Sequence, residues 1–180
     1  MKRQTGFTLV ELLVTMAAAA ILASIAVPNF KLSIQNSRLV TQANDLLGAV
    51  LYARSQAITM NKTVALCAST NATTTSPSCS TDPTAWSSGW IICQPDCSST
   101  TNVLRVHDAI AGGNTLTNTV SSATIAFGKD GSVANAPLSF DICDSRGASS
   151  GRSIYVYSAG QAKVSTTAGK QLDGTTAITC

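Results

Sequence analysis

A long apolar run near the N-terminus restricts this chain more than any other feature. It extends over 21 residues, from Phe7 to Val27, and Glu11 is the one charged residue in it. At about 1.5 Å per residue, a helix of that length can cross a hydrocarbon layer of about 30 Å. Lys2 and Arg3 precede the run and form a positive flank of the kind that stays in the cytoplasm. The rest of the chain is therefore expected on the other side of the membrane.

A secretory signal peptide is the alternative interpretation of this run. A short basic start, an apolar run and the small residues from Ser24 to Ala26 could form a cleavage site. That interpretation leaves Glu11 without a purpose, although a carboxylate inside a bilayer costs a few kcal/mol at least. It also gives no account of the chain after Pro28, where no break signal follows.

A helical pattern continues beyond Pro28. Apolar residues recur at steps of four and three, which places them on one stripe of a helix. They are Leu39, Ala43, Leu46, Val50, Ala53 and Ala57. Polar residues fill the positions between them. The pattern predicts one helix from Phe7 to about Met60, apolar all round in its first half and amphipathic in its second, with a bend or local loosening at Pro28.

The start of the apolar run carries the motif GFTLVE, from Gly6 to Glu11. This motif, with the apolar run up to Pro28, resembles the N-terminal signature of type IV pilins and pseudopilins. The resemblance implies that a prepilin peptidase in the membrane cleaves after Gly6 and methylates the new amino terminus at Phe7. It also implies that Glu11 pairs with the terminal amine of a neighbouring subunit during assembly. A carboxylate in a low dielectric is tolerated mainly beside a positive charge, which agrees with that role. A glutamate that snorkels or stays protonated in a monomeric anchor is the alternative.

Beyond Met60 the pattern changes to short β-type runs, which Gly, Pro, Asn and Asp separate. The predicted strands are Thr63–Ala68, Gly89–Gln94, Val103–His107, Ala123–Phe127, Ser139–Cys143, Arg152–Tyr157 and Gln161–Ser165. The last two are expected to form a hairpin that turns near Gly160, with Ile154 on one face and Tyr155 on the other. The sheet should close over the apolar stripe of the helix.

The expected fold is therefore α+β, a type IV pilin-like fold with a long N-terminal helix packed on antiparallel β-sheets. The predicted organisation is a leader peptide over 1–6, a transmembrane and assembly half of the helix over 7–28, and an amphipathic half over 29–60. Residues 61–180 form a β-rich, disulfide-containing globular domain in the periplasm or outside the cell.

Six cysteines lie in a polar, Ser- and Thr-rich region, and their even number favours disulfides in an oxidising compartment. They are Cys67, Cys79, Cys93, Cys97, Cys143 and Cys180. Cys67 and Cys79 bracket Ser69–Thr81, which is expected to be an exposed loop. Of fifteen possible pairings, the hypothesis is Cys67–Cys79, Cys93–Cys97 and Cys143–Cys180. Zinc is the alternative, but the chain has no CxxC spacing and one histidine, so no metal and no cofactor are predicted.

Four later segments resemble the GspH/FimT group of minor pilins and pseudopilins. They are YARSQAI (Tyr52–Ile58), SGWIIC (Ser88–Cys93), FGKDGS (Phe127–Ser132) and ICDSRG to GRSIYV (Ile142–Val156). The resemblance implies a subunit at or near the tip of a filament, with other major or minor pilins or pseudopilins as partners. Before assembly the protein would span the bacterial inner membrane once, with its globular domain in the periplasm.

DNA is a further partner that the resemblance suggests. Some FimT members bind DNA through a GRxR motif near the C-terminus, and the matching positions here are Gly151 to Ile154, without the second arginine. Arg146, Arg152 and Lys163 are the candidate phosphate contacts. The alternative is that these arginines are solvated or bind loop carbonyls. Removal of Lys2 and Arg3 would leave 10 of the 12 basic residues against 9 acidic ones, which argues against a broad basic surface.

No motif predicts an enzyme. His107 stands beside Asp108, but the chain has no GxSxG, HExxH or phosphate loop, so an exposed or hydrogen-bonded strand histidine is expected. Three functional hypotheses follow: a minor pilin in the initiating or tip complex of a type IV pilus, a GspH-like minor pseudopilin of a type II secretion system, and a DNA-binding minor pilin for natural transformation.

Overall fold

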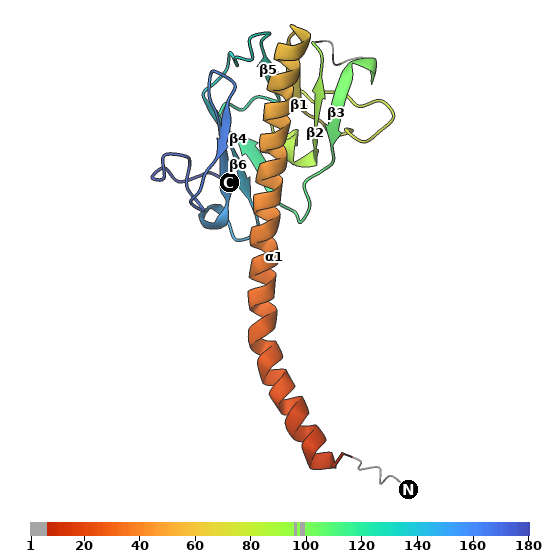
Figure 1. The fold of residues 1–180 in the computed structure, drawn as a ribbon, viewed down its shortest axis with the longest axis vertical. Helices are drawn as coiled ribbons and strands as arrows, with labels where there is room; N and C mark the ends of the chain where they lie inside the picture. The colour runs from red at the N-terminus through yellow and green to blue at the C-terminus, as the bar shows by residue number, and fades with distance from the viewer. Residues whose placement is uncertain (1–6, 96, 98–99) are drawn as a thin grey trace. The chain divides into compact units, whose positions relative to one another are not determined.

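The computed structural model describes residues 7–95, 97 and 100–180 (Figure 1). The chain divides into two compact units, Met1–Ser37 and Arg38–Cys180. One helix, α1 (Leu9–Met60), belongs to both, because the unit boundary falls within it. The predicted leader, 1–6, which includes Gly6, lies outside the described residues.

The described part of the first unit has no buried core. Every residue from 7 to 34 is exposed within the chain, including the large apolar side chains. Within the described ranges α1 is the one helix long and apolar enough to cross a membrane, judged by length and composition alone. The first unit therefore leaves its apolar surface available to a membrane or to other chains.

The second unit buries the stripe that the spacing predicts on α1. All six of its residues, from Leu39 to Ala57, are at most 1% exposed. Gln42 is buried among them at 5% exposure. Its Nε2 donates to the carbonyl oxygen of Ala111 at 2.8 Å, and its Oε1 accepts from Asn114 Nδ2 at 2.7 Å. Both ends of the amide are thus satisfied, as a buried polar group requires.

Two four-stranded antiparallel sheets complete the second unit. One has the order β3-β2-β1-β5, and the other has the order β4-β6-β7-β8. The strands of the first are β1 (Val64–Ala68), β2 (Trp90–Cys93), β3 (Val103–His107) and β5 (Thr124–Phe127). Those of the second are β4 (Thr115–Asn118), β6 (Leu138–Cys143), β7 (Arg152–Val156) and β8 (Ala162–Val164). In the part of the chain that the structure describes, three short 3-10 helices join them: η1 (Ala85–Ser88), η2 (Thr100–Asn102) and η3 (Ala148–Ser150). Both sheets contribute side chains to the core under α1.

The α+β architecture of the prediction is confirmed. Of the eight strands in the described residues, six lie within predicted runs, and β6 begins one residue before its predicted run, Ser139–Cys143. β4 is the strand that the sequence pattern did not predict. Its burial pattern includes one buried residue, Leu116, which pairs with Ile142 of β6. A short edge strand that inserts one apolar side chain has no period-2 signal over four to eight residues, so the pattern rule cannot detect it.

Aromatic side chains join the two sheets. Trp86 of η1 is fully buried, and its ring meets that of Phe140 of β6 edge to face, with ring centroids 4.8 Å apart. The indole N–H of Trp86 donates a hydrogen bond to the carbonyl oxygen of Ser122 at 2.9 Å. Such pairs contribute about 0.5–1.5 kcal/mol beyond their burial. This contact fixes the segment between β1 and β2 against the second sheet.

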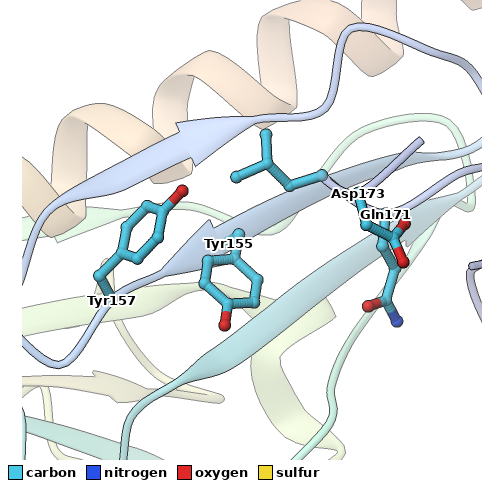
Figure 2. A pocket seen from close by; sticks show the side chains of 5 residues that line it. Tyr155, Tyr157, Gln171 and Asp173 are labelled. Atoms are coloured by element: carbon cyan, nitrogen blue, oxygen red, sulfur yellow. The ribbon is translucent and has the colours of Figure 1, made fainter. Parts of the chain in front are cut away.

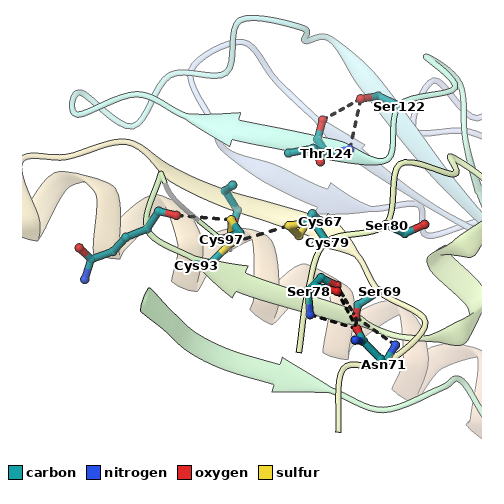
Figure 3. Close-up of a disulfide and its surroundings, with 12 residues drawn as sticks. Cys67, Ser69, Asn71, Ser78, Cys79, Ser80, Cys93, Cys97, Ser122 and Thr124 are labelled. Carbon is teal, nitrogen blue, oxygen red and sulfur yellow. Dashed lines mark hydrogen bonds between the residues drawn. A yellow bond between two sulfur atoms is a disulfide. The ribbon is translucent and has the colours of Figure 1, made fainter. Parts of the chain in front are cut away.

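The six cysteines form three disulfides in the pairing of the hypothesis: Cys67–Cys79, Cys93–Cys97 and Cys143–Cys180. The predicted exposed loop, Ser69–Thr81, does lie between β1 and β2, but the prediction was wrong for two of its residues, since Ser69 and Ala72 are buried. Asn71 organises this loop, because its Oδ1 accepts hydrogen bonds from Ser69 Oγ and from the Ser78 backbone N–H, both at 3.0 Å (Figure 3).

Candidate functional site

The candidate assembly segment begins at Thr8, which caps α1. The Thr8 Oγ1 atom accepts a hydrogen bond from the Glu11 backbone N–H at 3.2 Å. The pair follows the T-x-x-E pattern of a capping box, in which a threonine side chain satisfies one of the free N–H groups of the first turn. The cap places Glu11 in the first turn, where a carboxylate also interacts favourably with the helix dipole.

Glu11 is surrounded by exposed apolar side chains. Leu9, Val10, Leu12 and Leu13 are between 54% and 75% exposed, and Phe7 is 84% exposed. Within the described ranges no salt bridge involves Glu11. The segment thus combines an apolar surface with a single carboxylate, and no cation in the described part of the chain pairs with it.

Pro28 does not end the helix. The helical assignment continues through it, although its nitrogen can donate no hydrogen bond to the preceding turn. The neighbouring Asn29 side chain donates to the carbonyl oxygen of Ile25 at 2.9 Å. A side-chain amide therefore supplies an additional hydrogen bond in the turn that contains the proline.

The candidate DNA contact Arg146 is engaged by a carboxylate. Its guanidinium lies 2.6 Å (Nη2) and 2.9 Å (Nε) from Asp144 Oδ2. The Asp144 side chain is 4% exposed and that of Arg146 is 21% exposed. The hydrogen bond from the Arg146 side chain holds the pKa of the Asp144 carboxyl below its ordinary value. Arg146 therefore compensates a buried negative charge.

Arg152 and Lys163 leave opposite faces of the second sheet. Arg152 alternates with Ser153 along β7 and shares the face of Ile154, which is buried in the core. Lys163 is the cross-strand partner of Tyr155, whose side chain lies on the other face. The Arg152 guanidinium donates to the carbonyl oxygen of Thr166 at 3.3 Å, as the loop-carbonyl alternative expected. The sheet therefore does not bring these two cations together.

Comparison with known families decides the relationship of the chain. The family model of the type II transport protein GspH matches residues 42–160. The chain belongs to the GspH family. The model of the prokaryotic N-terminal methylation motif matches residues 1–27. The resemblance to type IV pilins and to the GspH/FimT group is thereby confirmed.

Solved structures agree with the fold described above. Two crystal structures of the type IV minor pilin FimU of Pseudomonas aeruginosa (strain PAO1) are similar in fold. The P21 form is 21% identical with a TM-score of 0.58, over 72% of this chain and 90% of FimU. The P65 form is 22% identical with a TM-score of 0.55, over 70% and 91%. At this identity the likeness establishes the fold alone. A comparison with curated proteins gave no match.

Gly151, the first residue of the incomplete GRxR match in this GspH-family chain, has a packing role. A Cβ atom at this position would lie 2.3 Å from Ile178 Cδ1 and 2.7 Å from the carbonyl oxygen of Ile142. The C-terminal segment that carries Ile178 is joined to β6 by the Cys143–Cys180 disulfide. The need for close packing therefore accounts for this glycine without any ligand.

An open cavity of about 480 Å³ lies beside β7, lined by Tyr155, Tyr157, Gln171, Leu172 and Asp173 (Figure 2). Asp173 is the charged residue of the lining. Hydrogen bonds from the Thr176 side chain and backbone, and then from Thr175, lower the pKa of its carboxyl. A carboxylate that stays ionised and is already hydrogen-bonded repels phosphate, so this cavity does not suit a nucleic-acid backbone.

His107 is a hydrogen-bonded strand histidine, as predicted. Its ring stacks on Trp90 with centroids 3.8 Å apart and planes 7° apart. Its Nδ1 lies 2.7 Å from the carbonyl oxygen of Asp108, to which it must donate. Its Nε2 lies 3.7 Å from Asp45 Oδ2. The stacking on Trp90 and the Nδ1 hydrogen bond hold the ring within the fold.

Sequence reasoning missed Thr8 as a positioning residue and Gln42 as a buried polar contact. The T-x-x-E spacing at the start of the apolar run was a signal that could have identified the cap. No local signal could have identified Gln42, because its partners, Ala111 and Asn114, lie 69 and 72 residues away.

Proposed function

We propose that this chain is a minor pilin, which enters a type IV pilus through the segment Phe7–Pro28 and belongs to the complex that starts the filament or forms its tip. The observation that carries the proposal is the described part of the first unit, residues 7–37, in which every apolar residue is exposed and the Glu11 carboxylate has no salt-bridge partner among the described residues. Membership of the GspH family and the methylation motif over residues 1–27 support it.

The exposed apolar surface alone gives this segment little reason to move from the lipid into a filament. Lipid tails are as apolar as a neighbouring helix, so burial alone distinguishes the two environments poorly. A buried carboxylate does distinguish them, since it is costly in lipid and stabilised by a cation. Glu11 therefore makes the filament a more favourable environment for the segment than the lipid, provided that a neighbouring subunit supplies a positive charge.

The terminal amine of Phe7 on the neighbouring subunit is the cation that we propose. Cleavage by a prepilin peptidase after Gly6 would create this amine, and methylation would leave its charge in place. Before assembly the chain would lie in the inner membrane with its second unit in the periplasm. Pro28 would allow α1 to adjust between the membrane and the filament.

The test compares Glu11→Ala with Glu11→Asp in cells that make pili. We expect both variants to be cleaved, and we expect Glu11→Ala to be depleted at least about tenfold from sheared filaments, because its partner's amine stays unpaired. Glu11→Asp keeps the charge and should be depleted less. Incorporation of Glu11→Ala at the normal level would contradict the assembly role.

Processing is tested separately with a substitution of Gly6. Gly6→Val should leave an uncleaved protein in the membrane, detected as a slower-migrating band and by the mass of its N-terminus. Cleavage of this variant at the normal rate would contradict the proposed leader over residues 1–6.

A minor pseudopilin of a type II secretion system is the second candidate. The description of the matching family, a type II transport protein, favours it. Deletion of the gene separates the two functions. Loss of surface pili with normal secretion supports the pilin, and loss of secreted enzymes with normal pili supports the pseudopilin.

A further inference from the structure

Two disulfides lie side by side on one face of the β3-β2-β1-β5 sheet (Figure 3). They join Cys67 to Cys79 and Cys93 to Cys97. The four Sγ atoms all lie within 4.8 Å of one another. Cys79 Sγ and Cys93 Sγ, which belong to different disulfides, are 3.9 Å apart. The two bridges therefore form a single cluster of four sulfur atoms, which we call the four-cysteine cluster.

The fold assembles this cluster from two strands and two loops. In the register of β1 and β2, Ala65 faces Cys93 and Cys67 faces Ile91, so Cys67 and Cys93 stand diagonally on the same face. Both side chains are fully buried. Cys79 and Cys97 come from the loops that flank β2 and are half-buried. The sheet thus fixes two sulfur atoms, and the loops bring the other two to them.

We propose that the reduced four-cysteine cluster binds one Zn²⁺ ion as a tetrathiolate site in place of the two disulfides. Zinc takes four thiolates in a tetrahedron with Zn–S distances of about 2.3 Å, which sets the sulfur–sulfur edge at about 3.8 Å. The distance of 3.9 Å between Cys79 Sγ and Cys93 Sγ already matches this edge. Because no pair exceeds 4.8 Å, sulfur atoms of different bridges need to approach by about 1 Å at most.

The surroundings of the cluster suit a structural site of this kind. Ala65, Ala72 and Ile91 pack with the four cysteines in a small apolar cluster, separate from the main core. An apolar shell limits the access of water to the metal and to its ligands. The half-buried Cys79 and Cys97 leave a route by which the ion can enter.

Zinc binding and disulfide formation exclude each other chemically. Four thiols that bind one Zn²⁺ release four protons. Each new disulfide in the cluster forms from two thiolates, which give two electrons to a disulfide of a protein oxidoreductase. That disulfide takes up two protons and becomes two thiols. Once its thiolate ligands are oxidised, Zn²⁺ leaves. The metal would therefore hold both loops on the sheet in a chain that has not yet been oxidised.

Local spacing hid this site, because no two of the four cysteines form a CxxC pair. The separations within the bridges are 12 and 4 residues. The pairing of β1 with β2 brings the two bridges together, so the cluster becomes visible only in the fold.

The test uses the full-length chain, reduced and metal-free in detergent micelles, and titrates it with Co²⁺ as a spectroscopic probe. We expect one Co²⁺ per chain, with the sulfur-to-metal charge-transfer and intense visible bands of a tetrahedral tetrathiolate site, and displacement of Co²⁺ by one equivalent of Zn²⁺. Circular dichroism, recorded in parallel, reports whether the sheets are folded. The oxidised chain should bind no Co²⁺ in this form.

Matched variants locate the site. Cys67→Ser and Cys93→Ser should each lower the Zn²⁺ affinity at least about tenfold and remove the tetrathiolate spectrum. The Cys143→Ser/Cys180→Ser variant should keep it, since those sulfur atoms form the disulfide of the other sheet.

Two results would overturn the proposal. One is a reduced, folded chain that binds no Co²⁺, and the other is a Cys67→Ser variant that binds as the control does. If the reduced chain is unfolded without metal, recovery of the β-sheet signal on addition of one Zn²⁺ supports the proposal, and failure of Zn²⁺ to restore it overturns it.

Discussion

The two units of this protein use apolar residues in opposite ways. From residue 7 to residue 34 every side chain is exposed, whereas from Leu39 onward one stripe of the same helix is buried under two sheets. The described part of the first unit leaves its apolar surface exposed, as the proposed assembly with other chains requires, whereas the second unit buries its own apolar stripe. A substitution in the first unit should therefore change assembly, and a substitution in the second should change folding.

The largest effect that sharpens this comparison is expected at the Cys143–Cys180 disulfide. It joins residues that are 37 positions apart, and the chain-entropy model credits such a link with about 4 kcal/mol. Cys143→Ser/Cys180→Ser should lower the free energy of unfolding by that amount without affecting cleavage after Gly6. Urea titration of the full-length chain in detergent measures it, because Trp86 and Trp90, both buried in the second unit, report its unfolding.

The Cys93→Ser/Cys97→Ser variant is the control for this measurement. The disulfide that this variant lacks spans 4 positions, for which the same model predicts a stabilisation of about 2 kcal/mol. Equal losses in the two variants would show that the length of the closed loop does not determine the stabilisation here.

The next effect compares one substitution at two positions of α1. Leu46 is fully buried, and Leu22 is 69% exposed. Leu46→Ala should cost about 3 kcal/mol of unfolding free energy, because it leaves a cavity in the core. Leu22→Ala should change it by no more than about 0.5 kcal/mol, but should lower incorporation into filaments. A loss above 1 kcal/mol for Leu22→Ala in urea titrations would show that the two units are energetically coupled.

The same division explains how much could be predicted from the sequence. The stripe from Leu39 to Ala57 follows from helical spacing alone, because one face of a helix is a local property. The proposed role of Glu11 rests on a motif, because contacts with other chains cannot be seen in the structure of a single chain. Both signals are contained in short stretches of sequence.

Features that depend on strand register could not be predicted in this way. Arg152 and Lys163 are both candidate phosphate contacts by sequence. Alternation along β7 and its pairing with β8 put the two side chains on opposite faces of the sheet. The four-cysteine cluster has the same origin, since Cys67 and Cys93 meet through the pairing of β1 with β2. β4 inserts only Leu116 into the core, which is too little apolar signal to mark a strand.

A smaller effect is expected at the ion pair of the second unit. Arg146→Ala should cost about 2 kcal/mol at pH 7, because it removes the charged hydrogen bonds to the buried Asp144 carboxylate. The lowered pKa of Asp144 means that the unfolded state binds more protons just below pH 3.8, so this contribution is complete above that pH and is lost as the pH falls through the folded-state value.

The measurement is urea unfolding of the wild type and Arg146→Ala at pH 7 and at successively lower pH. The difference between the two proteins should shrink as the carboxyl becomes protonated. Arg152→Ala is the control, since Arg152 makes one long hydrogen bond to a carbonyl oxygen and should contribute no more than about 0.5 kcal/mol. A difference that stays constant down to low pH would mean that Arg146 contributes through packing rather than through charge.

The smallest effect is expected on DNA binding. Because Arg146 is paired with Asp144 and the other two cations leave opposite faces, these residues do not form one phosphate-binding surface. The Arg152→Ala/Lys163→Ala variant of the full-length chain should therefore bind a labelled duplex within about threefold of the wild type, with a salt slope that changes by less than about one. Fluorescence anisotropy at two salt concentrations measures both quantities.

The opposite outcome is salt-sensitive DNA binding by the wild type that an Arg146→Ala/Arg152→Ala variant loses while its sheets stay folded. That outcome would make the second unit a DNA receptor. In that case its exposed surface, like that of the first unit, would serve a partner outside the chain.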